Sequence, residues 1–190
     1  MGVRLLVTTW DGDDYQRRFD DLAAKGVDVH GEVAFVMRYT PNSVLDAGCG
    51  TGRVAIELAN RGVATVVGAD VDLSMIATAR TRAPEVTWVE SDLGALDLGR
   101  RFDVVVMAGN VPLFTPEGTH AALVAGCARH VAPGNGVLIS GFQLGRGYEL
   151  EDFDAHANAA GLHLRERFAT WAAAAFPGDG SYAVSVHAKD

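Results

Sequence analysis

The chain has 190 residues, and its 48% hydrophobic and 21% charged residues are ordinary for one globular domain, which disfavours disorder, collagen and coiled coil. Sixteen basic against 24 acidic residues give a net charge of −8, and no basic run occurs, so we expect no nucleic-acid partner and no binding to an anionic membrane. No apolar stretch approaches the about 20 residues that span a bilayer, and the two cysteines lie outside any CxxC pattern, so we expect a cytoplasmic protein with reduced thiols.

The first 41 residues have a helical pattern. Tyr15, Phe19 and Leu22 recur at the spacing of one helix face, Gly26 interrupts the pattern, and Pro41 ends it. From residue 42 onward, short apolar runs alternate with amphipathic segments.

These runs predict an alternation of strands and helices. We expect five strands, over residues 43–47, 65–69, 86–90, 102–107 and 137–142. Helices are expected over residues 53–61, 72–82 and 150–160, with a further one starting at Thr115-Pro116. Two last strands, over residues 162–171 and 182–188, have no helix between them and are expected to pair antiparallel. The chain is therefore predicted to be an α/β protein with a seven-stranded, mostly parallel sheet, an antiparallel last strand and helices on both faces.

Ligands of such sheets bind beyond the carboxyl ends of the strands, so the residues that follow each strand are the candidates. The strongest signal is Leu45-Asp-Ala-Gly-Cys-Gly-Thr-Gly52, in which a strand runs into a glycine-rich turn before a helix. The dinucleotide fingerprint GxGxxG requires a third glycine at the position that Arg53 occupies. Asp46 beside this turn would repel a pyrophosphate but suits a cationic amino-acid group.

Three further strand ends carry candidate ligands. Asp70 could accept hydrogen bonds from a ribose diol, although a helix-capping role is the alternative. Asp92 could accept from the exocyclic amine of a base, with the Leu93 N–H serving a ring nitrogen, or it could make only a local turn. Ala108 and Gly109 leave room for a ligand, and Asn110 adds a polar group that could equally be a turn residue.

Three acids at consecutive strand ends, together with a GxGxG turn after the first of them, resemble the class I S-adenosylmethionine-dependent methyltransferases, over roughly residues 40–145. The resemblance implies a Rossmann-like fold and S-adenosylmethionine as cofactor. It places Asp46 and the turn around the methionine part, Asp70 on the ribose, Asp92 and Leu93 at the adenine, and Leu73 and Met75 beside the ring. The predicted cofactor-binding set is Asp46, Gly48, Cys49, Gly50, Gly52, Asp70, Val71, Met75, Asp92, Leu93, Ala108 and Gly109.

The resemblance also implies transfer of a methyl group by in-line displacement. The short N-terminal segment and the negative charge favour a small-molecule acceptor. We expect a single domain, with residues 1–41 as a helical lid and residues 42–190 as the core. His30, Asn110 and Tyr15 are the candidate catalytic residues, with His30 as a possible base, and no metal site is expected. Two alternatives stay open: an inactive S-adenosylmethionine-binding regulatory module, and a nicotinamide-dependent oxidoreductase. The sequence leaves the oligomeric state open.

Overall fold

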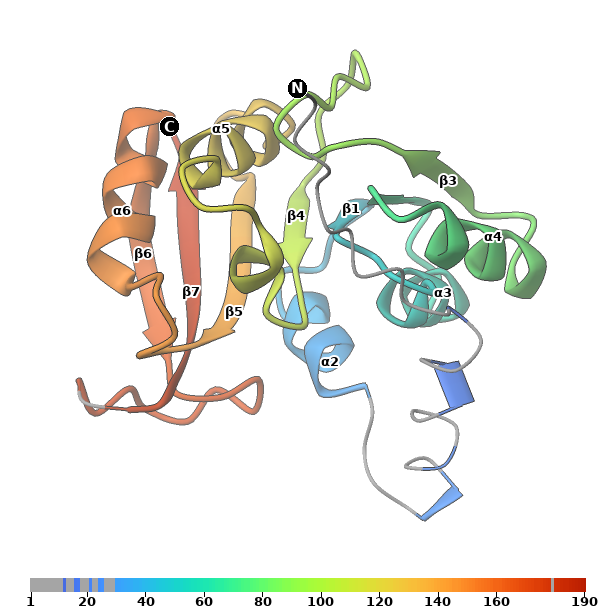
Figure 1. The fold of residues 1–190 in the computed structure, drawn as a ribbon, viewed down its shortest axis with the longest axis horizontal. Helices are drawn as coiled ribbons and strands as arrows, with labels where there is room; N and C mark the ends of the chain where they lie inside the picture. The colour runs from blue at the N-terminus through green and yellow to red at the C-terminus, as the bar shows by residue number, and fades with distance from the viewer. Residues whose placement is uncertain (1–11, 13–15, 18–20, 22–23, 26–29, 179) are drawn as a thin grey trace, which may run out of the picture.

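The computed structural model describes residues 12, 16, 17, 21, 24, 25, 30–178 and 180–190. A seven-stranded sheet runs through the molecule in the order β3-β2-β1-β4-β5-β7-β6 (Figure 1). All neighbouring pairs from β3 to β5 are parallel, whereas β7 pairs antiparallel with both β5 and β6. The strands are β1 (Ser43–Ala47), β2 (Thr65–Asp70), β3 (Thr87–Glu90), β4 (Val104–Met107), β5 (Val137–Gln143), β6 (Leu162–Phe168) and β7 (Tyr182–Lys189). The predicted fold class is confirmed.

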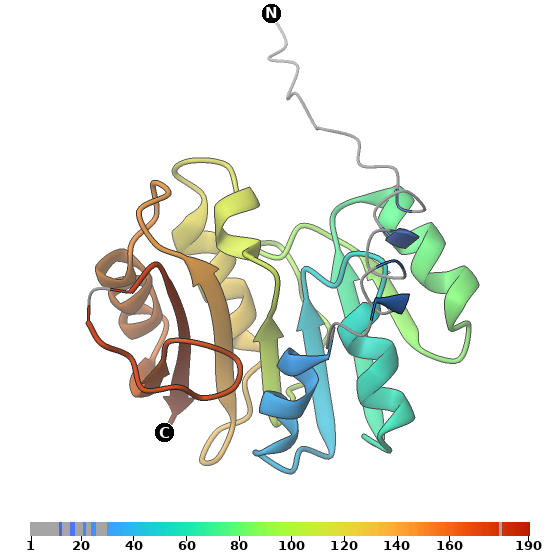
Figure 2. The same ribbon diagram turned by 90° about the horizontal axis from the view of Figure 1, so that it is seen from below.

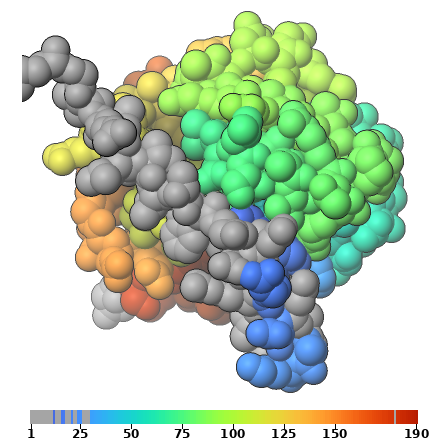
Figure 3. Space-filling view, turned by 45° about the vertical axis from the view of Figure 1, so that its right-hand side comes forward, coloured from blue at the N-terminus to red at the C-terminus, as the bar shows by residue number. Residues whose placement is uncertain are grey.

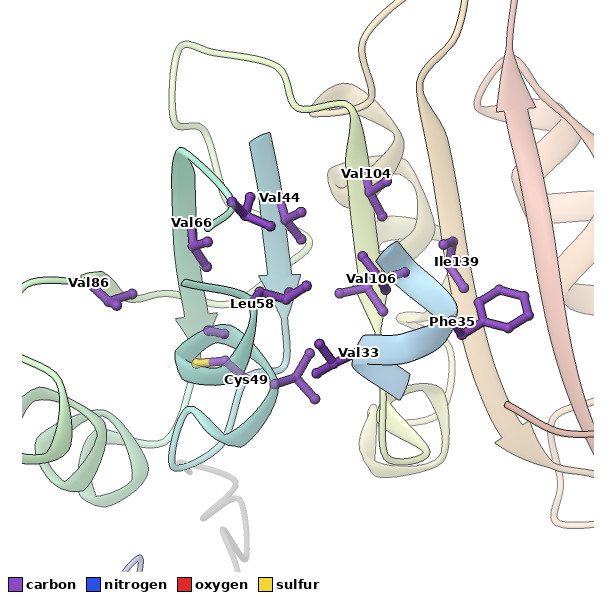
Figure 4. Close-up of a cluster of buried hydrophobic side chains, with 14 of the residues drawn as sticks. Val33, Phe35, Val44, Cys49, Leu58, Val66, Val86, Val104, Val106 and Ile139 are labelled. Atoms are coloured by element: carbon purple, nitrogen blue, oxygen red, sulfur yellow. The ribbon is translucent and has the colours of Figure 1, made fainter. Parts of the chain in front are cut away.

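The helices cover both faces of this sheet (Figures 1 and 2). They are α2 (Gly31–Met37), α3 (Arg53–Asn60), α4 (Leu73–Arg82), the 3₁₀ helix η1 (Val111–Phe114), α5 (His120–Arg129) and α6 (Leu150–Ala159). Apolar residues of α2, α3 and α4 pack in one buried cluster, shown in part in Figure 4, and those of α5 and α6 in a second cluster on the opposite face. Central strands such as β4 are buried on both sides, as expected for parallel strands between two helical layers.

Two predicted boundaries are wrong by three or more residues. The helix expected from Thr115-Pro116 begins only at His120, because Gly118 adopts a left-handed φ of +82° that no helix residue has. The strand expected to reach Trp171 ends at Phe168, where the chain turns back and Ala169 N–H donates to Ala174 O at 2.8 Å.

The N-terminal prediction is tested only in part. Helix α2 agrees with the pattern that ends before Pro41, and its N-cap position is His30. Tyr15, Phe19 and Leu22, on which the first helical pattern depends, lie outside the described residues. Within the described part of the chain, no helix is long and apolar enough to cross a membrane.

Candidate functional site

The glycine-rich turn after β1 has a backbone that only glycine tolerates easily. Gly48, Gly50 and Gly52 have φ values of +82°, +52° and +83°, which lie in the left-handed region. The turn is joined to β2 by hydrogen bonds from the Gly48 and Cys49 N–H groups to Ala69 O, at 2.8 and 3.1 Å. Gly52 is then the N-cap residue of α3, so the turn delivers a helix N-terminus to the carboxyl edge of the sheet.

Asp46 lies beneath this turn, with only 1% of its surface exposed. Its Oδ2 accepts a hydrogen bond from the Ala55 N–H at 3.0 Å, one of the free donors of the first turn of α3. Burial raises the pKa of Asp46 to about 7, against the lowering effects of the Arg53 guanidinium and of the Ala55 hydrogen bond. A cationic group placed nearby would favour the ionised form of this carboxyl.

Asp70 joins β2 to the same turn. Its Oδ2 accepts from the Gly50 N–H at 2.8 Å, and its Oδ1 accepts from the Asp72 N–H at 2.9 Å. Burial raises the pKa of Asp70, and the two backbone hydrogen bonds oppose that rise. The capping alternative belongs to Asp72, whose Oδ1 accepts from Ser74 and Met75 at the start of α4.

Large apolar side chains are exposed at the same edge. Val71 and Leu73, just after β2, are 67% and 61% exposed, whereas the side chain of Met75, in α4, is buried. Phe114, at the end of η1 after β4, is 68% exposed. Val71 and Leu73 thus form a small exposed apolar surface beside the glycine turn, of the kind on which an apolar part of a ligand packs. Of the residues predicted to flank an adenine, Leu73 is therefore presented outward and Met75 is not.

Asp92 follows β3 and is exposed. Its Oδ1 accepts from the Gly94 N–H at 2.7 Å, which is the local turn that was the alternative to a binding role. Its second carboxylate oxygen makes no hydrogen bond with any residue that the structure describes. The Leu93 side chain is buried at 8% exposure in the α5–α6 cluster, so only its backbone can meet a ligand.

The β4 end has open space and one oriented amide. A Cβ atom on Gly109, where φ is +79°, would have no described heavy atom within 4 Å, and Ala108 before it is half-buried. Asn110 is also left-handed, at φ +66°, and its Oδ1 accepts from the Gln143 N–H at 2.8 Å. The Asn110 oxygen thus ties the ends of β4 and β5 together, and this bond orients the NH₂ donor of the same side chain.

Cys49 contributes backbone to the turn, and its thiol points into the protein. The side chain is 8% exposed and belongs to the buried cluster of Figure 4, and burial raises the thiol pKa well above its ordinary value. The thiol therefore stays protonated. Thr51, the next non-glycine residue of the turn, donates its hydroxyl to Gln16 Oε1 at 2.7 Å.

The candidate catalytic residues are placed differently from one another. Asn110 lies at the strand ends with the cofactor candidates, whereas Tyr15 lies outside the described residues. His30 precedes α2 and lies near Glu57 of α3, where it assists Arg61 in lowering the pKa of that carboxyl. Near it, Glu32 of α2 makes a two-bond ion pair with Arg53, at 2.7 and 3.0 Å.

Sequence reasoning missed two side chains that contact the turn. The Arg82 guanidinium donates to Thr51 O at 2.7 Å, and the Trp88 indole lies against Gly52 and Gly68. The signal that could have found Trp88 was Gly68, a glycine inside an apolar strand, which often marks a close approach of another group. Nothing in the sequence pointed to Arg82. Among the described residues, no group of three or more His, Cys, Asp or Glu side chains could hold a metal ion.

Comparisons with known proteins agree with this geometry. The model of the methyltransferase domain family matches residues 44–134. The crystal structure of a TehB-like SAM-dependent methyltransferase from Corynebacterium glutamicum is 33% identical and superposes with a TM-score of 0.87, covering 94% of this chain and 98% of that one. The chain belongs to the class I S-adenosylmethionine-dependent methyltransferases. The cofactor of this family is S-adenosylmethionine.

Two curated methyltransferases are similar in sequence to part of the present chain. A trans-aconitate 2-methyltransferase from Azoarcus sp. is 33% identical over 142 residues, which is 74% of this chain and 53% of the relative. A dTDP-3-amino-3,6-dideoxy-α-D-glucopyranose N,N-dimethyltransferase from Streptomyces fradiae is 34% identical over 137 residues, which is 70% of this chain and 49% of the relative. The chain thus spans about half the length of these two relatives.

Proposed function

We propose that this protein transfers the methyl group of S-adenosylmethionine to a small-molecule acceptor. The observation that carries the proposal is the hydrogen bond between the glycine turn and the end of β2, in which Asp70 Oδ2 accepts from the Gly50 N–H. The exposed Val71 and Leu73 come just after Asp70 in the chain. One continuous edge thus offers a carboxylate for ribose hydroxyls, an apolar surface for a base, and a turn for the amino-acid end.

In this proposal, bound S-adenosylmethionine supplies an activated methyl group on a sulfonium sulfur. The residues of the chain bind and orient it. Asp46 lies where it can balance the ammonium charge, and Asp70 accepts hydrogen bonds from the ribose hydroxyls. The second carboxylate oxygen of Asp92 accepts from the adenine amine, and the Leu93 N–H donates to a ring nitrogen of the adenine. The open space at Gly109 leaves the methyl group accessible, and the Asn110 NH₂ is positioned to orient an acceptor. Alignment of acceptor, methyl and sulfur can supply several kcal/mol of the rate enhancement.

We further infer that residues 1–41 form a lid on a core of residues 42–190. Two described contacts support this. Gln16 accepts from Thr51 of the glycine turn, and the Gly12 N–H donates to Ser74 Oγ of α4 at 3.1 Å. Figure 3 shows described residues of this segment, in dark blue, beside the green side chains of α4. The segment thus contacts both sides of the proposed cofactor site.

A small acceptor is supported by the two curated relatives, one named for an organic acid and one for a nucleotide sugar. The net charge of −8 argues against a nucleic acid. A cytoplasmic location is supported by Cys49 and Cys127, which are both buried free thiols. The inactive-module alternative gains no support from relatives that are all named for methyl transfer.

Two measurements test the proposal. Calorimetric titration with S-adenosylhomocysteine is expected to give micromolar binding, about −8 kcal/mol, with no binding of NADH as control. Acceptor-dependent formation of S-adenosylhomocysteine is then measured with trans-aconitate, the amino sugar nucleotide of the relative, and a library of small acids and amines. Binding without any acceptor-dependent product would favour the inactive module, and NADH binding would favour the oxidoreductase.

A further inference from the structure

Two side chains from the end of α4 and from β3 hold the glycine turn from outside. The exposed Arg82 donates to the Thr51 carbonyl at 2.7 Å, across 31 positions of sequence. The next residue, Gly52, lies against Trp88 so closely that a Cβ on Gly52 would be 2.3 Å from Cη2 of the indole. Two consecutive residues of the turn are therefore fixed by groups that belong to a different βα unit.

The Trp88 indole is itself fixed. It is 8% exposed, and its Nε1–H donates to Ala83 O at 2.8 Å. The ring reaches the turn by crossing β2 at Gly68, where a Cβ would be 2.4 Å from Cζ3. Only glycine at position 68 lets the ring pass. The indole thus packs against β2 and the turn at once, in addition to the direct hydrogen bonds that join the two.

This contact matters because the two halves of the proposed cofactor site lie on those two elements. Asp70 and Leu73, for the adenosine half, follow β2, whereas the amino-acid half faces the turn. A turn with three left-handed glycines has more conformational freedom to lose than other segments, so contacts that hold it before binding favour affinity. We propose that Trp88 and Arg82 are positioning residues that set the glycine turn relative to the adenosine-binding residues.

The inference rests on the proposed function and makes a prediction specific to one half of the cofactor. S-adenosylhomocysteine contains the amino-acid part, and 5′-methylthioadenosine lacks it. Both are titrated by calorimetry into the full-length wild type, Trp88→Phe and Arg82→Ala. Phenylalanine is shorter than tryptophan and has no N–H, so it keeps an aromatic ring but loses the contact with Gly52 and the bond to Ala83. We expect S-adenosylhomocysteine to bind at least about tenfold more weakly to each variant, and 5′-methylthioadenosine to change less than about twofold.

Matched controls separate positioning from general damage. Trp171→Phe makes the same exchange at an indole that contacts Phe35 and Tyr182, and Arg61→Ala removes an exposed guanidinium paired with Glu57. Neither control should alter the ratio of the two affinities. Equal losses for both ligands, or no loss for S-adenosylhomocysteine, would overturn the inference. If Trp88→Phe does not fold, the Arg82→Ala result decides. A wild type that binds neither ligand refutes the proposed function itself.

Discussion

Replacing Asp46 by asparagine should make the protein more stable at neutral pH when no cofactor is bound. The carboxyl is buried at 1% exposure and accepts a hydrogen bond from the Ala55 N–H. Burial raises its pKa to about 7, from an ordinary value of 3.8, although the Arg53 guanidinium opposes the rise. Asparagine keeps the shape of the side chain and an oxygen that can accept from Ala55, but it carries no charge.

The sign follows from where the proton binds. Between about pH 4 and pH 7 the folded state keeps the Asp46 proton that the unfolded state has lost, so stability falls as the pH rises. The penalty is complete above pH 7 and absent below pH 4. The pKa of Asp46 is about three units higher in the folded than in the unfolded state. At about 1.4 kcal/mol per unit, the penalty to the free energy of unfolding is about 4 kcal/mol, to order of magnitude.

Urea unfolding of the ligand-free wild type and Asp46→Asn, at pH 5 and at pH 8, measures this effect. We expect the difference in the free energy of unfolding between the two proteins to grow by about 2–3 kcal/mol over that range, in favour of the variant. The exposed Asp97, exchanged for asparagine in the same way, is the control and should give a constant difference. A difference for Asp46→Asn that is also constant, or that shrinks as the pH rises, would refute the reasoning.

Three further predictions concern neighbouring contacts. Asp70→Asn should weaken S-adenosylhomocysteine binding about 10- to 100-fold by calorimetry, because a charged acceptor of hydrogen bonds is lost. Gly68→Ala should lower the free energy of unfolding by about 1–3 kcal/mol in urea, because its Cβ would overlap Trp88. Glu32→Gln should lower it by about 1–3 kcal/mol, because Arg53, 14% exposed, loses its charged partner.

Each of these has a control in the same chain. Asp72→Asn makes the same exchange at the N-cap of α4, where asparagine also caps well, and should leave the S-adenosylhomocysteine affinity nearly unchanged. Gly180→Ala adds a methyl group at ordinary contact distances, the nearest 3.5 Å, and should leave stability within about 0.5 kcal/mol. Glu57→Gln breaks the more exposed pair with Arg61 and should cost less than Glu32→Gln. Unchanged cofactor affinity in Asp70→Asn would contradict its ribose role.

The fold could be predicted because its signals are local. Continuous apolar runs such as Val104–Met107 are typical of strands buried on both faces, and an aspartate directly before a helical segment, such as Asp72, is typical of an N-cap. The start of α5 was predicted wrongly because Thr115-Pro116 has the local features of a helix start. Gly118, three residues after Thr115, adopts a left-handed conformation that prevents it, and glycine alone does not announce which conformation it takes.

The site was only partly predictable, for a physical reason. Residues at strand ends are brought together by the parallel topology itself, so Asp70 and the turn could be paired from sequence. The contacts of Arg82 and Trp88 depend on side-chain reach across β2, which no spacing rule encodes. Likewise, the sequence could identify Asn110 as a candidate site residue but could not show that its Oδ1 accepts a hydrogen bond from the Gln143 N–H.

The charges around the turn explain why it suits this cofactor better than a dinucleotide. Two carboxyl groups, those of Glu32 and Asp70, lie close enough to Asp46 to raise its pKa, and the Arg53 guanidinium lowers it. Arg53 makes its ion pair with Glu32, and among the described residues no cationic side chain makes an ion pair with Asp46 or Asp70. A pyrophosphate brought to this turn would add like charge, whereas the ammonium and sulfonium of S-adenosylmethionine would supply the missing positive charge. The replacement of the third fingerprint glycine by Arg53 and the acids beside the turn therefore favour the same ligand.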